Sequence, residues 1–181
     1  MRIALRRRTN RSLALLCVLA ASLLALALLS PGLWAQDVVD ASVHIEPPDL
    51  HGSRPLEKLT EAAVVRDYLE SWKSFSEALD QNDAADLDQD FVGTALTKLS
   101  DTVAEQQKLG IHTSYQAQSH NLQIVFYSPD GLSIQVVDDV NYTQQVMQGG
   151  SVLASQPMHA RYVAVLTPSQ TSWQVRIFQA Q

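Results

Sequence analysis

Residues 134–142 read IQVVDDVNY, and every second position from Ile134 to Tyr142 is apolar except Asp138. A period of two is typical of a strand that buries one face. Three other segments of the C-terminal half repeat this alternation: Leu122–Phe126, Tyr162–Leu166 and Trp173–Ile177. Turn-forming residues separate the four segments, at Pro129-Asp130-Gly131, Gln148-Gly149-Gly150 and Ser169–Ser172. The sequence therefore predicts a four-stranded antiparallel meander.

Upstream of the meander the apolar period changes to that of a helix. Between Pro55 and Leu79, apolar residues recur at steps of three and four, which predicts an amphipathic helix with Trp72 in the core. A second helix is predicted from Thr94 to Leu109, because Gly110 supplies a normal C-terminal stop. Since the helices precede the strands, the predicted fold class is α+β, with N-terminal helices packed on a curved sheet.

The N-terminus has the order of an export signal. Several arginines precede an unbroken apolar stretch from Leu13 to Leu29, and Leu33-Trp34-Ala35 follows as a cleavage site. This stretch has 17 residues, which is the lower bound for a spanning helix. Residues 1–35 are therefore a signal peptide or a membrane anchor, with cleavage after Ala35 favoured. The domain is expected in the periplasm or cell envelope, or secreted, and it would contact membrane only through residues 13–29 if uncleaved.

Residues 36–53 carry Pro47-Pro48 and Gly52 without a sustained period. They are predicted to form a flexible tether, with a short strand at Val43 and Ile45 as the alternative. The folded domain is then assigned to residues 54–181.

Charge and cysteine content exclude several classes of function. All 19 acidic residues but only eight of the 13 basic ones follow Ala35, a net charge of about −11. So acidic a domain should not bind nucleic acid or anionic lipid through general electrostatics. Cys17 lies in the apolar N-terminal stretch, so the remainder has no disulfide, thiol nucleophile or cysteine zinc site.

This layout resembles the nuclear transport factor 2-like superfamily, a cone of helices enclosed by a bent antiparallel sheet. The residues that carry the resemblance are the Ala62–Leu79 helix, the Asp83–Leu87 turn, the meander and the closing Trp173–Ile177 strand. Within the superfamily the pattern is most similar to envelope-exposed members, such as the intermembrane-space domain of plastid division proteins. The resemblance spans Leu56 to Phe178 and implies the fold more than the function.

Asp138 is the sharpest candidate for chemistry. The alternation of residues 134–142 places it on the apolar face, where a desolvated carboxylate suits a general base. The resemblance implies cavity carboxylates in isomerases and dehydratases, with a cavity tyrosine such as Tyr68 as oxyanion donor. Two alternatives are open for Asp138: a β-bulge at residues 136–139 that would turn it outward, and a structural pair. For Tyr68 the alternative is core packing.

No metal or cofactor is expected. His112, His120 and His159 are predicted near strand starts or in loops, and no two have the spacing of a metal or catalytic motif. The acidic run Asp86–Asp90 fails the EF-hand pattern because Phe91 and Thr97 occupy the positions of glycine and glutamate. Weak divalent binding and a solvated turn are the alternatives left for this run.

These observations favour a non-catalytic, exported binding domain for an unknown protein partner or a small apolar ligand. The alternative is a cavity enzyme of the isomerase or dehydratase type, with Asp138 as general base and Tyr68 as donor. A third hypothesis is a homodimer formed through the sheet. Its expected patch lies opposite the inferred core residues and comprises Val125, Tyr127, Val163, Val165 and Phe178.

Overall fold

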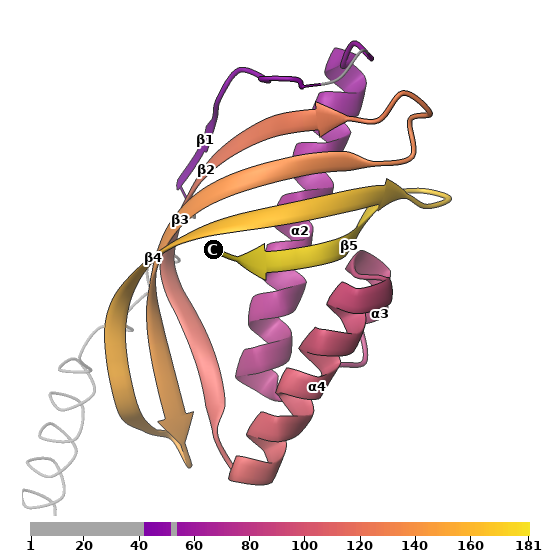
Figure 1. The fold of residues 1–181 in the computed structure, drawn as a ribbon. Helices are drawn as coiled ribbons and strands as arrows, with labels where there is room; N and C mark the ends of the chain where they lie inside the picture. The colour runs from indigo at the N-terminus through magenta and orange to yellow at the C-terminus, as the bar shows by residue number, and fades with distance from the viewer. Residues whose placement is uncertain (1–41, 52–53) are drawn as a thin grey trace, which may run out of the picture. The chain divides into compact units, whose positions relative to one another are not determined.

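A computed structural model describes residues 42–51 and 54–181 of the chain. These residues form an α+β domain in which helices pack on a five-stranded sheet of order β1-β2-β3-β4-β5 (Figure 1). The elements, in chain order, are β1 (Ser42–Ile45), α2 (Lys58–Gln81), α3 (Leu87–Asp90), α4 (Gly93–Leu109), β2 (His112–Tyr127), β3 (Ile134–Gln148), β4 (Ser151–Pro168) and β5 (Trp173–Ala180). The predicted export segment, residues 1–35, lies outside the described residues.

The sheet is mixed, whereas the sequence predicted a purely antiparallel one. Strands β2 to β5 form the predicted meander, but β1 adds a fifth strand parallel to β2. The backbone N–H groups of Glu46, Asp49 and His51 then donate to carbonyl oxygens of β2 at 2.8–3.0 Å. Residues 42–51 of the predicted tether are thus tied to the domain. Four strand residues are too few to show a convincing period of two, so the sequence favours a tether over a strand at this place.

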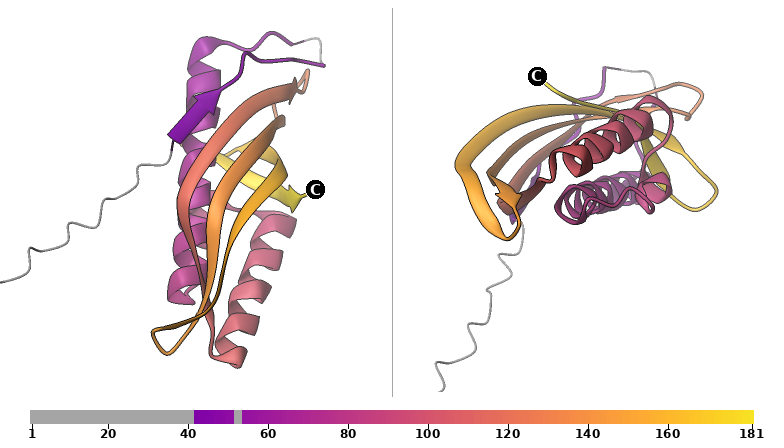
Figure 2. Two further views of the ribbon diagram at one scale, coloured as in Figure 1. Left: turned by 90° about the vertical axis from the view of Figure 1, so that its left-hand side faces the viewer. Right: turned by 90° about the horizontal axis from the view of Figure 1, so that it is seen from below.

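The helices lie along the concave side of the sheet, which bends around them (Figure 2). Helix α2 begins at Lys58, three residues after Pro55, and ends at Gln81. The next residue, Asn82, has a left-handed conformation (φ 54°) and caps the helix, because its N–H donates to the Ala78 carbonyl oxygen. Helix α4 ends at Gly110 (φ 66°), as predicted. The core lies between helices and sheet, and it is centred on Trp72, which is 1% exposed.

Two β-bulges change which side chains face the core. In β2 the register shifts between Ile124 and Phe126, so Tyr127 turns inward and Phe126 outward. In β5 the extra residue is Arg176, and Phe178 rather than Ile177 then packs against the core. Two residues of the predicted dimer patch, Tyr127 and Phe178, therefore face inward. Each bulge shifts the alternation by one position, which exchanges the two faces.

Among the residues described, none of the helices combines the length and apolar character needed to cross a membrane.

Candidate functional site

Asp138 lies on the inner face of β3. The β2–β3 pairing is regular from Ser119 opposite Asn141 to Ile124 opposite Val136, so no bulge disturbs residues 136–139. Asp138 is 0% exposed. The alternation of the sequence therefore holds through this position, and the outward-turned alternative is not what the structure contains.

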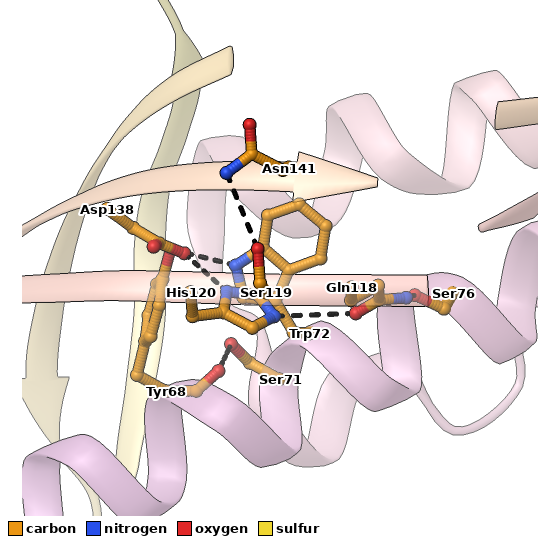
Figure 3. Close-up of polar contacts among 9 residues, drawn as sticks. All are labelled: Tyr68, Ser71, Trp72, Ser76, Gln118, Ser119, His120, Asp138 and Asn141. Atoms are coloured by element: carbon orange, nitrogen blue, oxygen red, sulfur yellow. Dashed lines mark hydrogen bonds and ion pairs between the residues drawn. The ribbon is translucent and has the colours of Figure 1, made fainter. Parts of the chain in front are cut away.

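Three side chains converge with Asp138 beneath the sheet (Figure 3). The Tyr68 hydroxyl of α2 donates to Asp138 Oδ2 at 3.0 Å, and His120 Nδ1 of β2 lies 2.7 Å from the same oxygen. Trp72 Nε1, one helical turn beyond Tyr68, donates to the Tyr68 hydroxyl oxygen at 2.8 Å. These four residues, called the Asp138 network below, join α2, β2 and β3 through buried hydrogen bonds.

His120 belongs to this network, although its sequence position predicted only a strand start or a loop. It is 4% exposed and pairs with Val140 across the ladder. Extending the alternation of Leu122 and Ile124 back by one step would have placed it on the inner face. A carboxylate oxygen accepts hydrogen bonds, so the tautomer of His120 with its proton on Nδ1 donates to Asp138 across this short contact. Its Nε2 lies 3.4 Å from the amide oxygen of Gln118.

One oxygen of the network has no partner. Asp138 Oδ1 is buried and accepts no hydrogen bond among the described residues. A buried carboxylate oxygen without a donor is costly, because it has lost its water without compensation. Oδ2 of Asp138 therefore has two hydrogen-bond partners, whereas Oδ1 has none among the described residues.

Burial fixes the protonation of Tyr68. Desolvation raises the pKa of its hydroxyl well above the ordinary value, and the nearby Asp138 carboxylate raises the pKa further. Tyr68 consequently stays a neutral hydrogen-bond donor at any physiological pH. Burial also raises the pKa of Tyr115 and of Tyr162, which stand on the same inner face.

An aromatic shell surrounds the network. The Trp72 ring lies 5.1 Å from the His120 ring and 4.9 Å from the Tyr162 ring, both in edge-on geometry. Phe75 and Phe178 approach the same indole at 5.4 Å. Edge-to-face aromatic contacts of this kind add to the energy of burial, and they leave the network enclosed by rings.

The network is closed to solvent in this structure. Tyr68, Trp72, His120 and Asp138 are each at most 4% exposed. Two surface pockets formed by described residues lie elsewhere, one beside α3 and one at the start of α4. A substrate would therefore reach Asp138 only after the packing around the network had opened.

A second buried carboxylate ties α2 to β5. Asp67 on α2 is buried, at 7% exposed. Its Oδ2 accepts the backbone N–H of Trp173 at 2.8 Å, and its Oδ1 accepts Arg66 Nε at 2.8 Å. A carboxylate that accepts a backbone N–H and a guanidinium is well compensated, so Asp67 holds the last strand against the first described helix.

The other candidates stay apart from the network. His112 Nδ1 lies 2.8 Å from the Asp80 carbonyl oxygen, and His159 Nδ1 lies 2.9 Å from Asn141 Oδ1. Within residues 42–51 and 54–181, no three His, Cys, Asp or Glu side chains are grouped so that they could hold a metal ion. In the acidic run, Asp86 accepts a hydrogen bond from Gln89, and Asp90 accepts one from Ser74.

The fold and network together define an α+β domain with helices seated in a curved mixed sheet. Neither a family model nor a curated protein sequence matches the chain. A solved structure does: the intermembrane space region of the chloroplast protein ARC6 superposes with a TM-score of 0.55 over 70% of this chain and 98% of that one, at 16% identity. This likeness shows the fold and agrees with the predicted resemblance to an intermembrane-space domain. The wider superfamily stays a prediction.

Proposed function

We propose that the chain is an exported, envelope-exposed interaction domain that binds a protein partner and catalyses no reaction. The observation that carries this proposal is the closure of the Asp138 network. Its most reactive groups, the carboxylate and the imidazole, are sealed under the sheet and hydrogen-bonded within the fold. These groups are positioned to hold α2 on the sheet, because the hydrogen bonds of Asp138 Oδ2 with Tyr68 and His120 join α2, β2 and β3.

Two features outside the network support the proposal. The arginine-rich, apolar N-terminus of the sequence directs the domain out of the cytoplasm. The fold is also that of the intermembrane space region of ARC6, a part of a protein that faces an envelope compartment. Both features favour a domain that meets its partner between or outside membranes.

Cross-linking of the full chain in its own cells, followed by mass spectrometry, tests this proposal. We expect a discrete partner protein, cross-linked equally to the wild type and to Asp138→Asn. The Asn variant is the matched control because it keeps the shape of the buried side chain and removes its basicity. Turnover of a small molecule that disappears in a folded Asp138→Asn variant would contradict the proposal.

A cavity enzyme is the second candidate, and the unpartnered Asp138 Oδ1 is the observation that favours it. In this alternative Asp138 is the general base, and Tyr68 is the neutral donor to a developing oxyanion. His120 would orient the carboxylate. A substrate-like hydrogen-bond donor would then occupy the free side of Oδ1, in a conformation where the helices stand away from the sheet.

The outer face of the sheet is proposed as the surface of a homodimer. Two ladder rows cross this face, Phe126–Gln135–Val165–Ile177 and Gln123–Val137–Val163–Gln179, and their centre is apolar. The next row carries Asp139 and Arg161, which pair at 3.1 Å. A two-fold axis maps such a patch onto itself, so each Asp139 can meet the other copy's Arg161.

Sedimentation velocity tests the dimer. We expect the wild type to dimerise and Val163→Asp to remain monomeric, because a carboxylate in the centre of the patch would be desolvated. Leu132→Asp is the matched control, since Leu132 is an exposed leucine in a turn outside the rows. A wild type that stays monomeric at high concentration would overturn the dimer.

A further inference from the structure

The N-terminal half of β4 leaves one backbone edge without a strand partner among the described residues. Strand β5 pairs with β4 only from Tyr162 to Pro168, and the N–H of Gln181 adds one bond to the Arg161 carbonyl. Residues 151–160 pair with β3 on one side. On the other side, no strand or backbone hydrogen bond from the rest of the described chain covers them. Figure 1 shows β4 running well past the end of β5.

This free edge is exposed and carries no charge. All residues from Ser151 to Pro157 are exposed, including Val152 at 52% and Leu153 at 57%. From Asn141 to Ala160 there is no Asp, Glu, Lys or Arg, although the domain as a whole is strongly acidic. Proteins protect edge strands with charges, prolines or bulges. The stretch from Ser151 to Gln156 contains a bulge at Leu153 but no charge and no proline.

A proline ends the usable edge, and a bulge lies within it. Pro157 has no N–H to donate, so a ladder added to this edge ends there. The β3–β4 register shifts between Val146 and Met147, which makes Leu153 the extra residue on β4. The stretch from Ser151 to Gln156 spans about 20 Å at roughly 3.3 Å per residue, the length of an ordinary strand.

We propose that Ser151–Gln156 is a docking edge for an extended, uncharged and apolar segment of a partner protein, added to the sheet as a further strand. The proposal rests on the proposed interaction function and names where and how the partner binds. Main-chain hydrogen bonds supply the pairing, and Val152 and Leu153 supply apolar contact. The absence of charge on the edge selects an uncharged segment, because a charged one would be desolvated without a compensating partner.

A second copy of the chain fits this edge less well than an unlike partner. Antiparallel pairing of Ser151–Gln156 with itself over its full length would set Ser151 against Gln156 and Val152 against Ser155. The two apolar side chains would then meet polar or small ones. A partner with apolar residues at the matching positions avoids this mismatch.

Hydrogen–deuterium exchange of the full chain in detergent micelles tests the proposal. The probe is an acetylated and amidated hexapeptide of alternating threonine and valine. At a peptide concentration about ten times its dissociation constant, we expect exchange of Ser151–Gln156 amides to slow by about tenfold, with β1 and β5 unchanged. The same peptide with alternate backbone amides N-methylated should give no protection, because it keeps the side chains and loses the ladder.

Paired variants make the test specific. Leu153→Lys should abolish the protection, since an edge lysine blocks strand addition. Leu132→Lys is the matched control, because Leu132 is 56% exposed and lies in a turn away from β4. Protection that survives Leu153→Lys or N-methylation, or no protection at about millimolar peptide, would overturn the proposal.

Two further outcomes distinguish an error in the docking edge from an error in the proposed interaction function. Self-association that Leu153→Lys removes would assign the edge to a second copy and overturn the partner segment. If the peptide fails while a protein partner is still cross-linked to the full chain, the docking edge is wrong and the proposed interaction function stands.

Discussion

At the scale of single residues, the decisive feature is a carboxylate with two hydrogen-bond partners and one oxygen that has none. Asp138 accepts hydrogen bonds from Tyr68 and lies within 2.7 Å of His120. The pairing compensates the loss of water by the charged group only in part, because Oδ1 has no donor. Asp138 therefore ranks as the residue whose removal should do most harm to this network.

Replacement of Asp138 by alanine should lower the free energy of unfolding by about 3–5 kcal/mol, because it strands two buried donors that met the carboxylate. Urea denaturation followed by circular dichroism measures the loss. Asp139→Ala is the control one residue away, since Asp139 pairs with an exposed arginine and should cost about 0.5 kcal/mol or less. Equal losses in the two variants would show that the Asp138 network does not hold the fold.

Replacement of Tyr68 by phenylalanine should lower the free energy of unfolding by about 1–3 kcal/mol, since it removes the acceptor of Trp72 Nε1 and the donor to Asp138. The ring is kept, so packing changes little. The indole N–H signal of Trp72 in a nitrogen-15 correlation spectrum should move upfield as its hydrogen bond is lost. An unchanged indole signal would contradict the described contact.

At the scale of elements, the two bulges matter more than the strand lengths. Simple alternation along β5 assigns Ile177 to the core and Phe178 to the outer face. The extra residue Arg176 exchanges them, and Phe178 stacks on Tyr162 with centroids 4.8 Å apart. The sequence has no mark for this bulge, because it depends on how β4 pairs with the strand.

Phe178→Ala should therefore lower the free energy of unfolding by about 2–3 kcal/mol, whereas Ile177→Ala should lower it by about 1 kcal/mol. The reason is that Phe178 contacts the rings of Trp72, Phe75 and Phe91, all in the core. Thermal and urea unfolding of the two variants compare the losses directly. A larger loss for Ile177→Ala would mean that β5 follows simple alternation after all.

At the scale of the whole domain, charge is divided between helices and sheet. Twelve acidic and five basic residues lie between Glu57 and Lys108, but only three acidic and two basic ones follow His112. The helical side is thus acidic and the sheet nearly neutral. Contacts through the sheet face or the β4 edge can form without overcoming the charge of the helices.

Alkaline pH should destabilise the domain through its buried tyrosines. Burial raises the pKa of Tyr68, Tyr115 and Tyr162 above the ordinary value of about 10. The folded state then holds these protons more tightly than the unfolded state. The contribution to stability is therefore complete below about pH 10 and is lost as the pH rises through the folded-state pKa values.

Urea denaturation at a series of pH values from 8 to 11 measures this loss. We expect the free energy of unfolding to fall above about pH 10. Tyr115→Phe should make the free energy of unfolding fall less steeply with pH. The variant has one buried tyrosine fewer, so unfolding releases one proton fewer at alkaline pH. A free energy of unfolding that is independent of pH across this range would show that the tyrosines are not sealed from solvent.

Local sequence patterns were enough to predict the order of helices and strands, the four-strand meander, the core position of Trp72 and the inward position of Asp138. These follow from local periodicity, which depends only on neighbouring residues. Only the tertiary structure decided that Ser42–Ile45 joins the sheet, that Tyr127 and Phe178 turn inward, and that His120 meets Asp138. Strand pairing, bulges and side-chain convergence depend on residues distant in the chain, and no local pattern records which distant strand fixes the register.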